Sequence, residues 1–189
     1  MLERPEDQEA AESPEGTPEG TERLKIRFPS PVGDVAMELR GDLVLKVAIC
    51  PPEEELEGYL QFEELEPSEF IDELFGRLSE YFAGARKDLE LRYDMEESGI
   101  TGFARKVFRE AAKIPYGRTR TYGRIAEKVG KPDAYRLVLA TLVTNPLPIV
   151  IPCHRVVTNK SGIGSYVGGQ EVKRWLMTME KEALKNNEV

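Results

Sequence analysis

Residues 145–157 read NPLPIVIPCHRVV, and the rest of the chain is best understood outward from this stretch. Its prolines and its apolar residues between 146 and 152 predict an extended segment that runs through the interior and delivers Cys153 to a buried position. The next residue is His154, the only histidine among 189 residues. A thiol beside an imidazole indicates a cysteine nucleophile with its base.

Adjacent positions do not by themselves place the two side chains in contact. Side chains at i and i+1 point to opposite faces of a strand and lie roughly 100° apart on a helix. A bridging water can still carry the thiol proton to the imidazole, provided that a carboxylate holds the imidazole from behind. We therefore expect an acidic partner for His154, and Glu180 is the candidate. The alternative is an inert buried cysteine beside a satisfied histidine.

The cysteine and histidine content limits the class of protein. Two cysteines and one histidine form no disulfide framework and cannot complete a Cys/His zinc site, so we expect no metal. No apolar run approaches the roughly 18 residues of a membrane span. The acidic N-terminus also lacks the basic start of a secretion signal. These features predict a soluble protein of the cytoplasm.

The formal net charge of −8 is unevenly distributed. Residues 1–22 hold eight acids and one base (−7), residues 23–100 hold nineteen acids and nine bases (−10), and residues 101–189 hold sixteen bases and seven acids (+9). The half that contains Cys153 is therefore basic. Such asymmetry indicates a polyanionic partner for one half, although an ordinary solvated surface is the alternative.

The first half predicts a small antiparallel sheet with one helix. Residues 1–22, rich in Glu, Pro and Gly, should form a disordered acidic tail. Cys50, at a strand end before Pro51, is expected to be a small core or edge residue. One helix is expected at residues 70–82, and Gly84 should end it. Short apolar strands separated by turns are expected at residues 24–28, 35–39, 43–49 and 89–93.

The second half predicts helices at residues 101–114, 122–129, 133–143 and 170–184. The tight turn between the middle two predicts a helix-turn-helix, although most short helix pairs only pack against each other. We accordingly divide the chain into an N-terminal α/β domain at residues 23–98 and a C-terminal domain at residues 99–189. The fold class is α+β, with a winged-helix-like C-terminal domain.

Longer runs of this sequence resemble a known family. Residues 145–157, followed by 162–169, look like the active-site signature of the O6-alkylguanine-DNA alkyltransferases, also called methylated-DNA–protein-cysteine methyltransferases. The resemblance extends upstream through Ile114–Gly123 and downstream to Glu180, covering about 101–183. The turn Ser30–Gly33 is also similar to that family's N-terminal domain, less specifically.

The resemblance implies DNA repair by direct reversal. The protein would bind double-stranded DNA, flip out O6-alkylguanine, or O4-alkylthymine, and transfer the alkyl group irreversibly to Cys153 in one turnover. No cofactor is implied, and a single-use repair protein has no need to be more than a monomer. The positions that match the family's catalytic residues are Cys153, His154, Glu180, Tyr122, Lys173 and Asn145. The positions that match its DNA-binding or base-binding residues are Arg136, Tyr135, Tyr166, Val156, Val167 and Arg155.

Individual roles also follow from the resemblance. Tyr122 would serve a ring nitrogen of the leaving guanine, and Lys173 with backbone amides near Val167 would serve its O6 region. Backbone carbonyls, including that of Val156, would read the exocyclic amine. Arg136 would enter the base stack and fill the vacated space. Taken singly, each residue also has an ordinary structural explanation, such as a core tyrosine or a surface charge.

One segment departs from the family pattern. The family's recognition helix carries small residues so that it can lie close in the minor groove, whereas the matching stretch here contains Tyr135, Leu137 and Leu139. This bulk predicts either a helix that stands further off the groove or apolar wedges that deform the DNA step more strongly. A smaller departure is Val167, where a serine is common.

Three classes of function compete. The leading one is the single-turnover alkyltransferase. The second is a non-catalytic protein that binds alkylated lesions, which the intact Cys153 argues against. The third is a multiple-turnover cysteine hydrolase, which the adjacent Cys-His order makes a poor fit.

Overall fold

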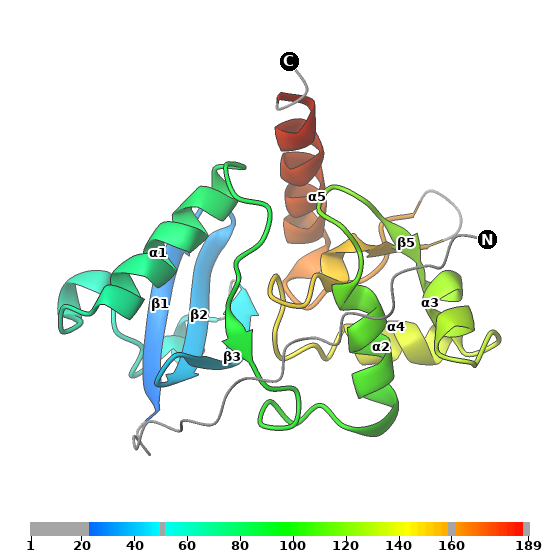
Figure 1. The fold of residues 1–189 in the computed structure, drawn as a ribbon, viewed down its shortest axis with the longest axis horizontal. Coiled ribbons are helices and arrows are strands. Elements are labelled where there is room, and N and C mark those ends of the chain that lie inside the picture. The colour runs from blue at the N-terminus through cyan, green and yellow to red at the C-terminus, as the bar shows by residue number, and fades with distance from the viewer. Residues whose placement is uncertain (1–22, 50–51, 159–161, 187–189) are drawn as a thin grey trace, which may run out of the picture.

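A four-stranded sheet whose first three strands are antiparallel forms the first part of the protein (Figure 1). The computed structural model describes residues 23–49, 52–158 and 162–186; the expected acidic tail and Cys50 lie outside these ranges. The predicted fourth strand rejoins the sheet in parallel with the third, and it is shorter than expected. The strands, in sheet order, are β1 (Leu24–Ser30), β2 (Gly33–Arg40), β3 (Leu43–Ile49) and β4 (Arg92–Tyr93).

One helix, α1 (Glu69–Phe82), lies against this sheet, and it follows two short 3₁₀ helices, η1 (Glu53–Leu56) and η2 (Phe62–Glu64). Its apolar side chains recur every three or four residues and are buried on one face. Aromatic rings join the helix to the sheet, with the centroids of Phe28 and Phe75 5.4 Å apart. The helix ends beside Gly84, whose φ of +74° is a conformation that glycine adopts without strain.

Helices dominate the second half of the molecule, as the sequence predicts. Arg120–Thr121 (β5) and Val156–Val157 (β6) add a parallel pair of very short strands. The side chain of Thr121 caps one helix by accepting from the amide of Arg124 at 3.2 Å. Asp133 does not begin the next helix, because that helix starts after Ala134 without a side-chain cap. The helices are α2 (Gly102–Ala112), α3 (Tyr122–Lys128), α4 (Tyr135–Leu142) and α5 (Gly169–Asn186).

The run at residues 145–157 is buried, as expected, but it is not continuously extended. Ile149 has a φ of +71°, and the Ile151 amide donates to the carbonyl of Leu147 at 2.7 Å, so the chain turns back on itself. A 3₁₀ turn, η3 (Cys153–Arg155), follows directly. The reversal is held by Asn145, whose Oδ1 accepts from the Leu147 amide and whose Nδ2 donates to the carbonyl of Ile151. The reversal brings Ile151 and Cys153 back beside the side chain of Asn145.

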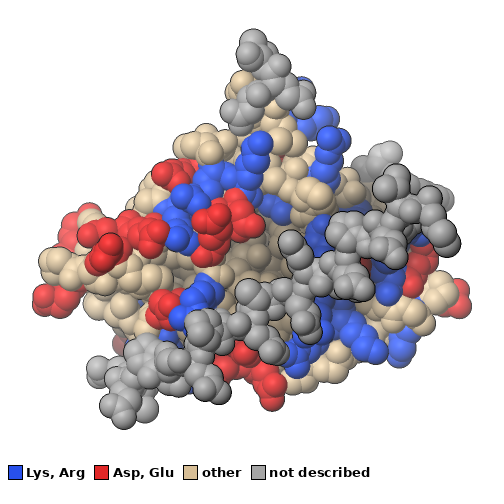
Figure 2. Space-filling model, in the orientation of Figure 1, with Lys and Arg blue, Asp and Glu red and all other residues tan. Residues whose placement is uncertain are grey.

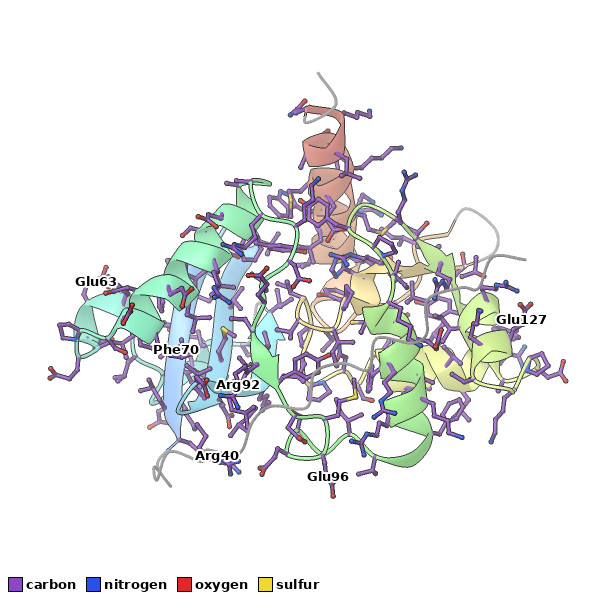
Figure 3. The ribbon with its side chains drawn as sticks, viewed as in Figure 1. Arg40, Glu63, Phe70, Arg92, Glu96 and Glu127 are labelled. Atoms are coloured by element: carbon purple, nitrogen blue, oxygen red, sulfur yellow. The ribbon has the colours of Figure 1, made fainter. Side chains whose placement is uncertain are left out.

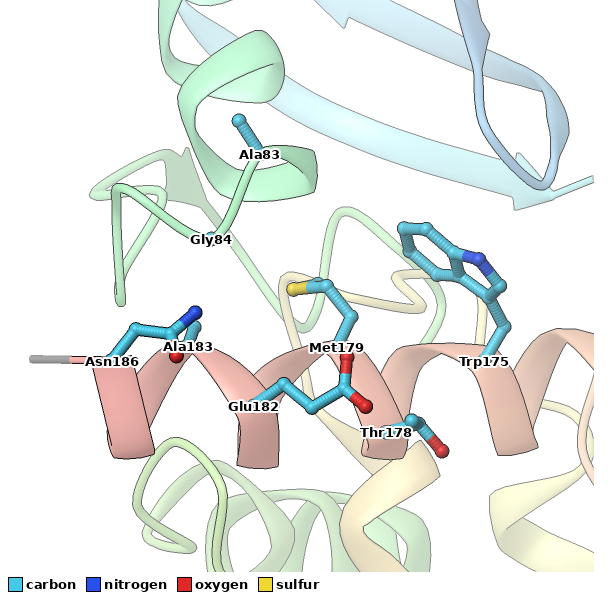
Figure 4. Close-up of a pocket in the computed structure, with 8 residues that line it drawn as sticks. All are labelled: Ala83, Gly84, Trp175, Thr178, Met179, Glu182, Ala183 and Asn186. Carbon is cyan, nitrogen blue, oxygen red and sulfur yellow. The ribbon is translucent and has the colours of Figure 1, made fainter.

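The two halves share one continuous apolar core. The Val47 amide of β3 donates to the carbonyl of Pro146 at 2.7 Å, and helix α5 rises between the sheet and α2 (Figure 1). At the end of α1 the approach is close, because a Cβ placed on Gly84 would lie 2.9 Å from that of Ala183. Beside this contact, a pocket of about 250 Å³ lies between the end of α1 and helix α5, and Trp175 and Met179 line it (Figure 4).

Charged side chains lie on the outside of the N-terminal half. Acidic groups interspersed with Lys and Arg groups cover the α1 side of the molecule, and Lys and Arg groups also gather over the side of α2 and α4 (Figure 2). Charged residues from both halves reach outward at the periphery, among them Arg40, Glu63 and Glu127 (Figure 3).

In the part of the chain that the structure describes, no helix is long and apolar enough to span a membrane. The α+β fold class is confirmed.

Candidate active site

Cys153 lies inside the protein at the end of the reversed run. Only 3% of the residue is exposed, and Asn145 Nδ2 donates to its Sγ at 3.1 Å. Burial raises the pKa of the thiol to about 11, although Asn145, the charge of Lys173 and nearby backbone amides act in the opposite direction. The thiol is therefore protonated at neutral pH, and it needs a base before it can react as a nucleophile.

His154 and Glu180 form a fully buried pair. The expected contact is present, with His154 Nε2 2.8 Å from Glu180 Oε1 and exposed fractions of 0% and 1%. Burial alone would raise the pKa of Glu180, but the hydrogen bonds and charges of His154 and Arg155 outweigh it and lower that pKa to about 2. An ionised carboxylate can only accept, so Nε2 of His154 carries the hydrogen.

The other ring nitrogen of His154 is the chemically informative one. Burial lowers the pKa of the imidazole, which is therefore neutral at physiological pH. With the hydrogen on Nε2, the Nδ1 atom holds a lone pair. Nδ1 is buried and has no hydrogen-bond partner among the residues that the structure describes. The site thus contains a neutral base with an available lone pair one residue from a protonated thiol.

Arg155 does not face a DNA surface, contrary to our expectation from the sequence. Its guanidinium is buried against Glu180, with Nη2 2.8 Å from Oε1 and Nε 3.0 Å from Oε2, and Nη1 donates to the carbonyl of Ile114 at 2.8 Å. The arginine therefore balances the charge of Glu180 within the core. No local pattern indicated this contact, because residues 155 and 180 belong to different elements.

Two further donors to Glu180 were missed. The hydroxyl of Tyr81, from α1, donates to Oε1 at 2.9 Å, and the amide of Gly117 donates to Oε2 at 2.9 Å. No local pattern connects residue 81 with residue 180. Gly117 carried a readable signal, since a glycine after Pro115-Tyr116 suggests a positive φ, and its φ is +66°. A Cβ there would run into the side chain of Leu184.

Lys173 and Tyr122 form a second buried group beside the thiol. Lys173 Nζ donates to the carbonyls of Val156 and Ser165 at 2.5 and 3.2 Å and to Tyr122 Oη at 3.3 Å. Burial lowers the pKa of Lys173 to about 8, opposed by Cys153, and burial raises the pKa of Tyr122 to about 12. The glycine of residue 164 permits this packing, because a Cβ there would collide with the Tyr122 ring.

The predicted recognition helix α4 presents a mixed face to solvent. Tyr135 and Leu137 are 46% and 49% exposed, and the guanidinium of the exposed Arg136 lies 5.5 Å from the centre of the Tyr135 ring. Val138 is buried in the core. Leu139 is partly buried and packs against the core, so only part of its bulk can lie on the outer face.

The loop before α5 places Tyr166 and Val167 differently. Tyr166 is buried, and its ring lies edge-on to the imidazole of His154, with centroids 6.1 Å apart and planes at 84°. Val167 is exposed. Within the described ranges, no group of three or more His, Cys, Asp or Glu side chains is arranged to hold a metal ion.

Comparisons with known proteins agree with this fold. The sequence model of the family described as "6-O-methylguanine DNA methyltransferase, DNA binding domain" matches residues 102–182, a stretch that contains Asn145, Cys153, His154, Arg155, Lys173 and Glu180. The chain belongs to the family of methylated-DNA–protein-cysteine methyltransferases, as the resemblance of its sequence implied.

Particular relatives can be named. The methylated-DNA–protein-cysteine methyltransferase of Methanosarcina barkeri is 36% identical over 121 residues, which is 64% of this chain and 75% of that protein. The constitutive enzyme of Bacillus subtilis is 41% identical over 110 residues, 58% of this chain and 65% of that protein. The crystal structure of Mycobacterium tuberculosis O6-methylguanine methyltransferase superposes with a TM-score of 0.71 at 28% identity, covering 86% of this chain and 94% of that one. The same tuberculosis protein has also been solved in complex with DNA.

Proposed function

We propose that this protein repairs DNA by moving an alkyl group from O6 of guanine, or from O4 of thymine, to the Sγ atom of Cys153. The observation that carries the proposal is the buried arrangement of a protonated thiol beside a neutral His154 that is held by Glu180. The relatives' names describe the same class of reaction for those proteins. Under this proposal the alkylated Cys153 is the end product, so each molecule reacts once.

The reaction balances with the groups present. A bridging water passes the thiol proton to Nδ1 of His154, and the carboxylate of Glu180 stabilises the imidazolium that forms. The sulfur then attacks the alkyl carbon, the carbon–O6 bond breaks, and its electron pair leaves with the guanine. Asn145 and the positive charge of Lys173 lie beside the sulfur and favour the thiolate.

The departing guanine gains negative charge and needs a proton. Tyr122 is suited to supply a hydrogen bond or proton to a ring nitrogen, because Lys173 Nζ lies 3.3 Å from its hydroxyl oxygen and stabilises negative charge there. In the net reaction the alkyl group moves to sulfur, and the thiol's proton is balanced by the one that guanine gains. The carbonyl of Val156 is suited to accept from the exocyclic amine while it also accepts from Lys173.

Access to the buried sulfur requires that the damaged base leave the duplex. Helix α4 is the element suited to the minor groove, since Arg136 and Leu137 project from it into solvent. We propose that Arg136 fills the gap left by the flipped base and that Leu137 wedges beside it. The complex of the tuberculosis relative with DNA supports a DNA substrate.

Mass spectrometry of the intact protein tests the proposal. After incubation with excess O6-benzylguanine, or with a duplex containing O6-methylguanine, one benzyl or methyl group per molecule is expected, and peptide mapping should place it on Cys153. The chain supplies its own control, because the second cysteine, Cys50, should stay unmodified. Cys153→Ser should gain no mass.

Other results would select a different function. Tight binding to the modified duplex without a gain in mass at Cys153 would indicate the non-catalytic lesion-binding protein. Recovery of unmodified protein after many turnovers on a test ester would indicate a hydrolase. Reaction with modified DNA but not with the free base would mean that the free base does not reach Cys153, although the transfer step itself works.

A further inference from the structure

Tyr81 connects the N-terminal half to the reaction centre through one hydrogen bond. Its hydroxyl donates to Glu180 Oε1 at 2.9 Å across 99 residues of sequence, and both side chains are about 1% exposed. The ring is held edge-on by Phe82 and by Tyr116, with centroids 5.5 and 6.1 Å away. A hydroxyl fixed in this way has little freedom to turn from the carboxylate.

The oxygen that Tyr81 contacts is the one that His154 uses. Oε1 also accepts from Arg155 Nη2, so the negative charge on this atom is shared among three donors. Arg155 already balances the charge of Glu180, and Gly117 already occupies Oε2. Charge balance alone therefore does not explain the tyrosine. A hydroxyl on Oε1 acts on the strength and the direction of the bond to His154.

We propose that Tyr81 is a positioning residue of the alkyl-transfer reaction, whose hydroxyl orients Glu180 and limits how strongly this carboxylate attracts a proton to His154. The inference rests on the proposed function, in which His154 must be neutral to receive the thiol proton. Under it, the N-terminal half contributes directly to the base and does not only support the fold. Its core helix α1 reaches the site through this one hydroxyl.

The direction of the effect follows from the charges around the imidazole. Without the Tyr81 hydroxyl, Oε1 keeps more negative charge, stabilises the imidazolium and raises the pKa of His154. The remaining groups stay in place and act as a constant background. They are Arg155 and Cys153 on η3, Lys173 on α5, Tyr166 in the loop before α5, and Tyr116 with the amide of Gly117 in the loop after α2.

Replacement of Tyr81 by Phe removes the hydroxyl and keeps the ring. Because the chain has one histidine, NMR of untagged protein labelled in histidine reports on His154 alone. The midpoint of its titration should rise by about half a pH unit in Tyr81→Phe. The acid limb of the single-turnover rate on O6-benzylguanine should move by the same amount, which is roughly a threefold slower rate on that limb.

Tyr59→Phe is the matched control, since Tyr59 also donates to a carboxylate, Glu38 Oε1 at 3.1 Å, but away from the site. It should leave both the titration and the acid limb where they are. Placing 4-aminophenylalanine at position 81 restores an N–H donor and should return both towards wild type. A Tyr81→Phe protein that loses thermal stability but keeps the wild-type titration and acid limb would overturn the proposal.

Failure of the proposed function would look different from failure of this inference. If wild-type protein never gains an alkyl group on Cys153, the function is wrong, whereas the NMR titration still measures the effect of Tyr81 on His154. If wild type reacts and Tyr81→Phe matches it at every pH, only the role of Tyr81 is wrong. Should Tyr81→Phe not fold, the 4-aminophenylalanine protein compared with 4-methoxyphenylalanine at the same position makes the same test.

Discussion

The two halves of the molecule differ in what they bury. In the N-terminal half the buried side chains are apolar, apart from the hydroxyl of Tyr81, and the charges lie outside. In the C-terminal half a group of polar and charged side chains is buried together: Asn145, His154, Arg155, Lys173 and Glu180. Apolar burial stabilises a fold, whereas burial of charge costs desolvation that partners must offset. The difference separates a region that stabilises the protein from one that is arranged for a reaction.

The strongest test of this comparison removes charge from the polar core. Glu180→Gln leaves the buried guanidinium of Arg155 without its counter-charge, so we expect a loss of about 3–5 kcal/mol in the free energy of unfolding. The imidazolium also loses its stabilising carboxylate, and alkyl transfer should slow by about 100-fold. Urea unfolding and single-turnover rates measure the two effects.

Leu74→Ala is the counterpart in the apolar core. Leu74 is buried in the N-terminal half, and its truncation should cost a similar 2–5 kcal/mol, about the usual range for such a cavity. The folded protein should nevertheless transfer the alkyl group at the wild-type rate. A rate as slow as that of Glu180→Gln would break the proposed division between the two regions.

Acid should destabilise the polar core before the apolar one. The pKa of Glu180 is lowered to about 2 in the folded protein from an ordinary 4.5. Its contribution, about 3 kcal/mol, is therefore fully present above pH 4.5 and is lost as the pH falls towards 2. Urea unfolding at pH 6 and pH 3 measures this loss. In Glu180→Gln the difference between the two pH values should be smaller, and an equal difference would assign the acid sensitivity to other groups.

The smallest expected effect concerns the exposed face of α4. Leu137→Ala removes a side chain that is half-exposed, so stability should change by less than about 0.5 kcal/mol. If Leu137 wedges into the duplex, transfer from modified DNA should slow roughly threefold to tenfold, since an apolar wedge is worth about 1 kcal/mol. The rate on free O6-benzylguanine should not change.

Leu60→Ala offers a control for the wedge, as an exposed apolar residue in the N-terminal half. It should affect neither substrate. A faster reaction of Leu137→Ala with DNA would instead mean that the leucine holds the helix away from the groove. Either change in the rate on DNA, with stability nearly unchanged, would show that the exposed surface of the second half acts on DNA binding, whereas its buried centre acts on the chemical step and on stability.

Local patterns predicted most of the secondary structure. The helices and the strands β1 to β3 follow from the spacing of apolar residues, and the burial of Cys153 followed from the apolar run before it. The partnership of His154 with Glu180 was also anticipated, because a histidine base requires a carboxylate and Glu180 stood at the matching position of the last helix.

Contacts between distant elements were beyond such patterns. Arg155 has the sequence context of a surface cation, and only the fold reveals that Glu180 draws it inward. The turn at Ile149 was hidden because a β-branched residue rarely adopts a positive φ. Tyr81 sits in an apolar helix repeat that gives no hint of its polar contact. For Arg155 and Tyr81 the decisive partner, Glu180, lies in another element.

The tight packing around Cys153 implies that reacted and unreacted molecules differ in stability. With Asn145 3.1 Å from the sulfur and only 3% of the residue exposed, an added alkyl group would crowd its neighbours. A reacted molecule must therefore displace its neighbours, and it should melt at a lower temperature than a fresh one. Used and unused copies then differ in folding stability, so the protein carries a durable physical mark of each lesion that it has removed.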